Sequence, residues 1–223
     1  MVLKILAFIS LFSAIFILTV TIYPIVSYEI LSREKFPRLL SPLVESSLLP
    51  SQESDSLKAS NWFVGARGED FSVSKVNYYT LSIPKLKIAS ATVAIGGEDL
   101  SENLIHYPGT SIPGKNGNAV IFGHSVLPRF YNPKEYISIF SLLPTLEKGD
   151  EIKVNFDGIT YLYKVEEMFE VLPTDIQVLE QNYSDSFLTL VTCTPPGDPR
   201  RPKRLIVRAR IVPFEKNYAN LGS

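Results

Sequence analysis

The stretch "LTLVTCTPPGDPRRPKRLIVRARI", residues 188–211, decides the fold, because two apolar runs flank a loop that can continue neither of them. Residues 188–193 have the composition of a strand, and residues 204–212 alternate between apolar and mostly basic side chains. The ten residues between the runs, 194–203, include four prolines and one glycine. The stretch therefore predicts two antiparallel strands joined by a loop.

The register of that strand pair gives the only cysteine of the chain a specific partner. If the strands pair across the loop, Cys193 lies opposite Arg204, and opposed residues share a face of the sheet. Leu188 and Leu190 then point into the core, so the thiol is expected on the arginine face and away from the apolar one. This placement favours a reactive thiol over a buried cysteine that fills the core.

The N-terminal segment has the length and composition of a membrane span. Residues 5–28 contain no charged side chain, and these 24 residues would form a helix of roughly 36 Å, enough to cross a ~30 Å hydrocarbon core. The apolar run is longer than that of a signal peptide and no small-residue cleavage site follows, so residues 1–28 are expected to be an uncleaved signal anchor. One lysine precedes the span and three basic residues follow it by position 38, so charge alone does not favour a cytoplasmic N-terminus.

The remainder of the chain reads as a linker followed by an all-β domain. Residues 29–78 are expected to be a juxtamembrane segment and a linker, since residues 41–60 hold seven serines. Residues 79–214 contain many short strand patterns and one short helix candidate, at 135–143, which indicates an all-β barrel or sandwich. Residues 215–223 form a polar tail. A net charge of −1 and a pI near 6.2 give no electrostatic signature of nucleic-acid binding.

Nucleophilic catalysis by the thiol would also require a proton carrier, and the chain has only two histidines, His106 and His124. His124 follows a buried strand and a glycine, where its side chain can project at the rim of a barrel, so it is the favoured partner of Cys193. His106 lies in a turn-rich loop. Zinc binding by one cysteine and two histidines would offer too few ligands at unfavourable spacing, so no metal and no cofactor are expected.

Several segments together resemble the sortase family of cysteine transpeptidases over residues 79–214. They are "SIPKLKI" (82–88), "HYPGT" (106–110), "VIFGHS" (120–125), "TLVTC" (189–193) and "RLIV" (204–207). The resemblance implies a closed, mainly eight-stranded β-barrel with short helices, and catalytic roles for His124, Cys193 and Arg204. It also implies a single-pass protein of the cell membrane whose catalytic domain is extracytoplasmic.

The resemblance further implies the reaction and the partners. A sortase of this kind cleaves an LPXTG-like signal near the C-terminus of an exported protein, forms a thioacyl intermediate on Cys193, and transfers the protein to an amine acceptor, either a cell-wall precursor or a pilin lysine. Thr192 and Thr194 flank the thiol and are candidates for substrate binding, as is His106, to which no catalytic role is assigned. The motif "CTPPG", with no Asp-Pro-aromatic lid motif and no second span, suggests class D or E.

Two alternatives to a transpeptidase stay open. A membrane-anchored cysteine peptidase that only hydrolyses its substrate would share the acyl-enzyme step, and an amine nucleophile that yields no transfer product would identify it. A non-catalytic barrel that binds peptides would keep its full function in a Cys193→Ala variant.

Overall fold

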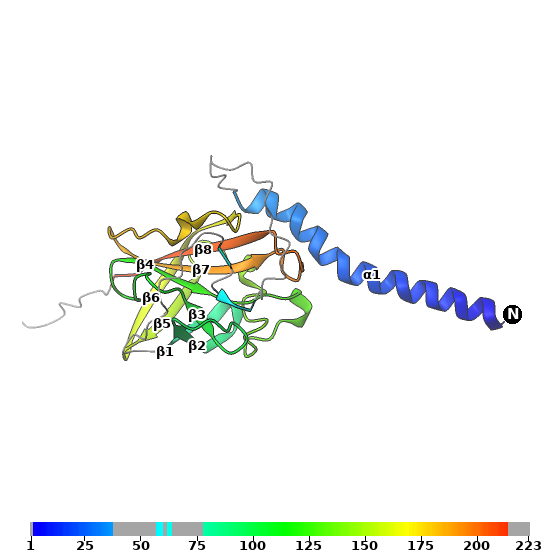
Figure 1. The fold of residues 1–223 in the computed structure, drawn as a ribbon, viewed down its shortest axis with the longest axis horizontal. Coiled ribbons are helices and arrows are strands. Elements are labelled where there is room, and N and C mark those ends of the chain that lie inside the picture. Colours follow the sequence, from blue (N-terminus) through cyan, green and yellow to red (C-terminus); the bar gives the residue numbers. More distant parts are fainter. Residues whose placement is uncertain (1, 38–56, 60–61, 64–77, 214–223) are drawn as a thin grey trace, which may run out of the picture.

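The computed structural model describes residues 2–37, 57–59, 62–63 and 78–213, in which eight strands form a closed barrel preceded by one long helix (Figure 1). This confirms the predicted all-β barrel. The strands are β1 (Tyr78–Ile83), β2 (Ile88–Ile95), β3 (Leu104–His106), β4 (Gly117–Phe122), β5 (Glu151–Phe156), β6 (Ile159–Val171), β7 (Ser186–Thr194) and β8 (Lys203–Ile211).

The order of the strands around the barrel is β1-β2-β3-β4-β7-β8-β6-β5, and β5 pairs with β1 to close it. The pairs β2–β3 and β4–β7 are parallel, and the other neighbours are antiparallel. Strand alternation sends one set of apolar side chains, including Leu188, Leu190 and Val207, into the barrel interior. A second apolar cluster, which includes Val191 and Ile206, covers the opposite face of β4, β7 and β8.

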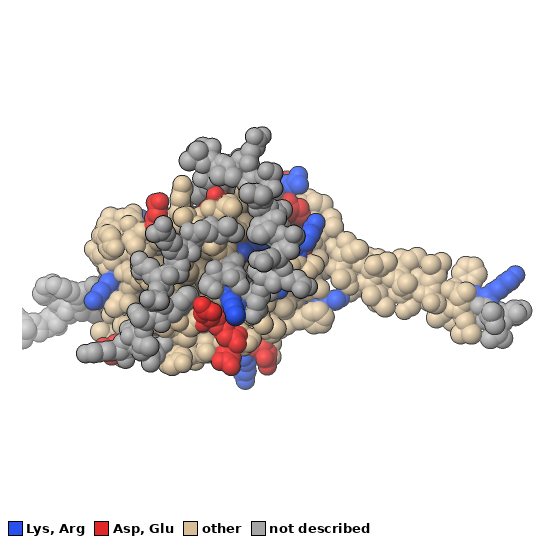
Figure 2. All heavy atoms as spheres, viewed as in Figure 1, with Lys and Arg blue, Asp and Glu red and all other residues tan. Residues whose placement is uncertain are grey.

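The helix α1 (Val2–Lys35) continues seven residues past the predicted span of residues 5–28. It is long and apolar enough to cross a membrane. Figure 2 shows the helix free of charged side chains between the barrel and the blue side chain near its N-terminal end. Figure 1 shows that α1 approaches the end of the barrel where β7 ends and β8 begins.

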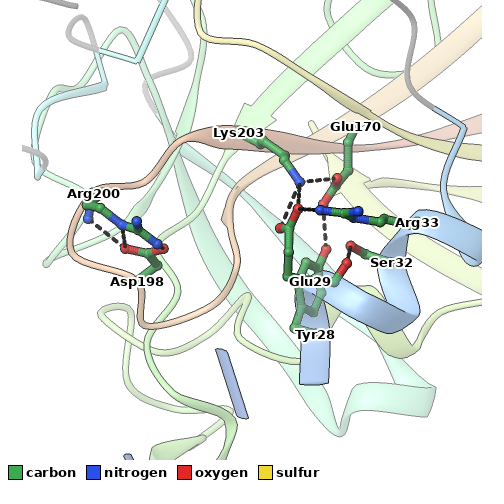
Figure 3. Close-up of polar contacts among 8 residues, drawn as sticks. All are labelled: Tyr28, Glu29, Ser32, Arg33, Glu170, Asp198, Arg200 and Lys203. Carbon is green, nitrogen blue, oxygen red and sulfur yellow. Dashed lines mark hydrogen bonds and ion pairs between the residues drawn. The ribbon is translucent and has the colours of Figure 1, made fainter. Parts of the chain in front are cut away.

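The C-terminal end of α1 packs against the barrel through a partly buried ionic cluster (Figure 3). The Tyr28 hydroxyl donates to Glu170 Oε1 at 3.0 Å, and Lys203 Nζ lies 3.2 Å from Glu170 Oε2 and 2.9 Å from Glu29 Oε2. Phe36 is buried in the apolar cluster of the barrel interior. The helix and the barrel therefore meet in a packed interface at this point.

The predicted helix at residues 135–143 is wrong. The chain there forms consecutive turns, in which the Ser138 N–H donates to the Glu135 carbonyl and the Ser141 N–H to the Ser138 carbonyl, three residues back. Pro144 follows too closely for an α-helix to extend. Short 3₁₀ helices occupy this and other loops: η2 (Pro84–Leu86), η3 (Pro128–Phe130), η4 (Leu143–Thr145) and η5 (Ile176–Leu179).

Part of the predicted linker lies on the barrel. Leu57 and Lys58 pair with the loop after β2 through a backbone bond from Leu100 and a β-bridge to Asp99. Trp62 and Phe63 are buried. The serine-rich residues 41–56 and the tail 215–223 lie outside the described residues, and the predicted domain boundaries stay predictions.

Candidate active site

Strands β7 and β8, together with the loop that directly follows β4, bring Cys193, Arg204 and His124 into one row. In the antiparallel pair β7–β8, Cys193 lies opposite Arg204, so the predicted register is confirmed. In the parallel pair β4–β7, Phe122 lies beside Val191, and the same register continued two residues brings His124 beside Cys193. Because neighbouring strands lie about 4.8 Å apart, this register brings the backbones of the three residues close together. The charge of Arg204 acts on the Cys193 thiol.

Hydrogen bonds fix the loop that carries His124 onto the end of β7. The Ser125 hydroxyl donates to the Cys193 carbonyl at 2.9 Å, and the Thr192 hydroxyl donates to the Gly123 carbonyl at 2.9 Å. The Ser125 N–H donates to His124 Nδ1 at 2.7 Å. Nδ1 is therefore an acceptor, and the neutral ring carries its proton on Nε2.

Burial makes the neutral form of His124 the stable one. Desolvation lowers the pKa of His124 to about 4, and the positive charge of Arg201 acts in the same direction. At neutral pH the ring is therefore uncharged and ready to accept a proton.

The thiol is also neutral in this state. Cys193 is 3% exposed, and its burial raises the pKa of the thiol, while the charges of Arg204 and Arg201 act in the lowering direction. The prediction that the cysteine face is not apolar is wrong, because Cys193 belongs to the second apolar cluster together with Phe122 and Val191. That face carries Arg204 as expected, but aromatic side chains cover it.

Backbone carbonyls hold the Arg204 guanidinium. Its Nε donates to the Trp62 carbonyl at 3.1 Å, and its Nη1 donates to the carbonyls of Arg201 at 3.0 Å and Lys203 at 3.1 Å. Within the part of the chain that the structure describes, no carboxylate forms an ion pair with Arg204. Burial lowers its pKa, although the neighbouring thiol favours the charge. Because these backbone carbonyls carry no net charge, the positive charge of Arg204 is not neutralised. It can therefore stabilise negative charge that develops on a substrate.

Trp62 closes the site from the linker side. Its ring stacks on Phe122 with centroids 5.4 Å apart, and the Arg204 guanidinium lies 5.3 Å from the ring centroid. Phe63 packs against the same Phe122 ring. The Trp62 side chain thus packs over the row that holds the three candidate catalytic residues.

The β7–β8 loop is held in place by its own contacts. The Asp198 carboxylate accepts hydrogen bonds from Arg200 Nε at 3.0 Å and Nη2 at 2.7 Å (Figure 3), and these bonds lower the pKa of Asp198. Gly197 has a φ of +82°, and a Cβ there would lie 2.8 Å from the Leu127 nitrogen. Only glycine therefore lets this loop pack closely on the loop after His124.

The other predicted site residues lie apart from the row. Alternation points the side chains of Thr192 and Thr194 to the face opposite Cys193, so only their backbone amides lie near the thiol. His106 is buried, with Tyr79 Oη 2.8 Å from Nδ1 and Thr110 Oγ1 3.1 Å from Nε2. Substrate binding by these three residues stays a prediction, and the placement of the His106 ring does not favour it.

Sequence reasoning missed the roles of three residues at the site. Trp62 comes from the linker, which gives no signal of where it docks. Arg201 is one of several loop cations, and only the fold shows that its charge acts on both the thiol and the imidazole. Ser125 was visible in the "GHS" motif, but its bonds to His124 and Cys193 were not. Among the described residues, no group of three or more His, Cys, Asp or Glu side chains could hold a metal ion.

Comparison with known proteins identifies the family of the barrel domain. A family model, the sortase domain, matches residues 81–212. Sortase A of Streptococcus agalactiae serotype III (strain NEM316) is 29% identical over 132 residues, which cover 59% of this chain and 48% of that protein. The chain thus matches about half the length of this relative.

Solved structures agree as well. A Clostridium perfringens sortase D5 transpeptidase is 30% identical with a TM-score of 0.52, covering 61% of this chain and 79% of the other. Sortase C-1 of Actinomyces oris is 29% identical with a TM-score of 0.54, covering 63% and 77%. Sortase A of Corynebacterium diphtheriae is 29% identical with a TM-score of 0.54, covering 65% of each chain. With a family model that matches more than half of its residues, this chain belongs to the sortase family.

Proposed function

We propose that this chain is a membrane-anchored cysteine transpeptidase. It would cleave an LPXTG-like sorting signal of an exported protein and transfer that protein to an amine acceptor, a cell-wall precursor or a pilin lysine. The observation that carries the proposal is that Cys193 and Arg204 are paired on β7 and β8, with His124 two residues past the end of β4, which pairs with β7. Helix α1 supports a single-pass anchor. The extracytoplasmic side of the barrel is part of the proposal and rests on the resemblance to sortases.

In the first half-reaction the Cys193 sulfur attacks the carbonyl carbon of the scissile peptide bond as its proton passes to His124. The new C–S bond forms, and the Arg204 N–H groups donate to the oxygen on which negative charge develops. The C–N bond then breaks, and His124 gives its proton to the departing amine. A thioester on Cys193 and a neutral His124 remain.

In the second half-reaction the acceptor amine attacks the thioester carbon. His124 takes a proton from this amine, the C–S bond breaks, and the proton returns to the Cys193 sulfur. A new C–N bond replaces the one that was cut, so atoms and charges balance without water.

Substrate access requires a change in the segment that covers the row. The Trp62 carbonyl accepts from Arg204 Nε, a position that a peptide oxygen would need. The Trp62 ring must therefore leave Phe122 and Arg204 before acylation. Binding energy of the sorting peptide would drive this movement.

Mass spectrometry of the full chain incubated with a panel of sorting peptides tests the proposal. A thioacyl adduct is expected on the native chain and on a Tyr183→Phe control, whose exposed ring lies in the β6–β7 loop, and none on Cys193→Ala. Adding an amine should release a transfer product. Release of the acid alone would favour the hydrolytic peptidase, and acylation of no peptide would favour the non-catalytic barrel. Assignment to class D or E stays a prediction, since the relatives include sortases named A, C and D.

A further inference from the structure

A loop beside the catalytic row contacts the anchor helix inside its apolar segment. Arg129 Nη1 donates to the Val20 carbonyl at 3.4 Å. In an α-helix this carbonyl would accept from the N–H of residue 24, but residue 24 is Pro24, which has none. The missing helical bond leaves an acceptor free, and Arg129 of the barrel supplies its donor.

The position of Val20 in α1 shows how deep in a membrane the contact between Arg129 and Val20 would lie. A hydrocarbon core of ~30 Å corresponds to about 20 helical residues, so a span that begins at Ile5 ends near Pro24. At about 1.5 Å per residue, the Val20 carbonyl then lies on the order of 6 Å inside that boundary. The donor is the Arg129 guanidinium itself, so its charge lies at about this depth, where a charge costs far less than at the bilayer centre.

The tip of the same loop is an exposed aromatic residue. Phe130 is 60% exposed, and the Arg129 guanidinium lies 4.7 Å from the centroid of its ring. A single exposed apolar side chain is ordinary on a soluble surface. Here it lies next to the residue that contacts the anchor helix, and an aromatic ring paired with a cation suits the membrane interface.

A groove of about 530 Å³ separates the anchor from the catalytic loops at this height. Tyr23, Pro24 and Leu31 line it from α1, and Pro128 and Pro196 line it from the loops that follow His124 and Cys193. Its exposed lining is mostly apolar, with Lys35 and Glu147 among its polar members. Lipid hydrocarbon suits such a lining better than water does.

We propose that the loop Pro128–Phe130 is a second membrane contact, which enters the lipid interface beside α1 and holds the catalytic end of the barrel toward the bilayer. The inference rests on the membrane anchoring proposed above. Leu127 packs against Gly197 of the β7–β8 loop, so this contact also fixes the height of the loop that follows Cys193. The thioester would then form next to the lipid surface, where substrates and acceptors held by the membrane are concentrated.

Depth-dependent quenching in vesicles of phosphatidylcholine and phosphatidylglycerol tests this inference on the full chain. A Cys193→Ala background removes the native thiol, and a fluorophore is attached through Phe130→Cys. Two matched positions serve as references: Phe12→Cys within the apolar length of α1, and Ile159→Cys, half exposed at the β5–β6 hairpin. Spin-labelled lipids carry the quencher near the head group or deep in the acyl chain.

Shallow quenchers are expected to act on position 130, deep quenchers on position 12, and neither on position 159. Position 130 behaving like position 159 while position 12 is quenched would overturn the inference and leave the anchor intact. No quenching at position 12 would overturn the anchoring proposal together with the inference. Adding Arg129→Ala should reduce the quenching at position 130 by half or more, and unchanged quenching would show that the Val20 contact does not hold the loop.

Discussion

At the scale of single residues, burial sets the protonation of the two proposed catalytic residues, Cys193 and His124. It raises the pKa of Cys193 and lowers the pKa of His124 to about 4, so both groups are neutral while Trp62 covers the row. A thiolate forms readily only when water or substrate charge reaches the sulfur. The covered state is therefore expected to be nearly inert toward electrophiles.

Trp62→Ala should make Cys193 more reactive. Uncovering the thiol reverses the desolvation that raises its pKa, and each unit by which the pKa falls increases the thiolate fraction about tenfold at pH values below it. We expect the rate of alkylation by iodoacetamide at pH 7.5 to rise roughly tenfold. Tyr183→Ala, which removes an exposed ring elsewhere, should leave the rate unchanged. Equal rates for Trp62→Ala and the native chain would show that Trp62 does not control access.

His106 should make the fold sensitive to acid. Burial lowers the pKa of His106 from 6.5 to about 4. The unfolded chain therefore binds a proton at His106 below pH 6.5, whereas the folded chain binds it only below about pH 4. The free energy of unfolding is therefore highest above pH 6.5. It falls by up to about 3 kcal/mol as the pH drops from 6.5 to about 4. Urea unfolding of His106→Gln should show a gain over the native chain of about 2–3 kcal/mol between pH 7 and pH 4.5. His124 titrates in both proteins and cancels in the comparison, and a constant difference would contradict the prediction.

At the scale of elements, the β7–β8 loop needs Gly197 for two separate reasons, its positive φ and its approach to Leu127. Gly158 in the β5–β6 turn has a φ of +76° but open space around its Cβ position, so it is a matched control. Gly158→Ala should cost about 1 kcal/mol of unfolding free energy with activity retained. Gly197→Ala should cost about 1–3 kcal/mol more and lower kcat/KM at least tenfold, because the loop must move away from Leu127. Equal effects of the two variants in unfolding and peptide-acylation assays would show that the Leu127 contact is unimportant.

The interface between α1 and β8 depends on Lys203, whose Nζ contacts both Glu170 and Glu29. The Glu170 side chain is 1% exposed, so Lys203→Met leaves a buried carboxylate without its cation. We expect a loss of about 3–5 kcal/mol in the free energy of unfolding, measured in detergent. Adding Glu170→Gln should recover most of it. Lys85→Met, which breaks an exposed ion pair with Asp150, should change stability little.

At the scale of the whole molecule, the sequence pattern predicted those features of the fold that depend on residues close together in the chain. The apolar run of α1, the strand pair around Cys193 and the opposition of Cys193 to Arg204 all follow from composition and alternation. The cover over the thiol does not, because Trp62 is distant in sequence and its docking depends on the shape of the folded barrel. The helix predicted at 135–143 failed because helical periodicity over nine residues cannot exclude consecutive turns.

The packing of α1 against the barrel also could not be predicted from the sequence pattern. This packing leads to a prediction for the whole molecule. A fragment of residues 26–213 keeps the bond from Tyr28 to Glu170 and the buried ring of Phe36, whereas a fragment of residues 38–213 loses both. A hydrogen bond to a charged group and a buried aromatic ring each contribute about 1.5–3 kcal/mol, and ordering the short helix offsets part of this.

We therefore expect the longer fragment to be more stable than the shorter one by about 2–4 kcal/mol in urea unfolding without membrane or detergent. The longer fragment with Tyr28→Phe and Phe36→Ala is the matched control, and it should fall to the stability of the shorter fragment. The pairing of Lys203 with Glu29 is expected to be lost in the shorter fragment too, and Lys203 precedes Arg204 directly on β8. Peptide acylation by the shorter fragment should accordingly be slower. Equal stability and equal rates in the two fragments would mean that α1 acts only as a tether, because a docked helix that contributes to the barrel cannot be removed without cost.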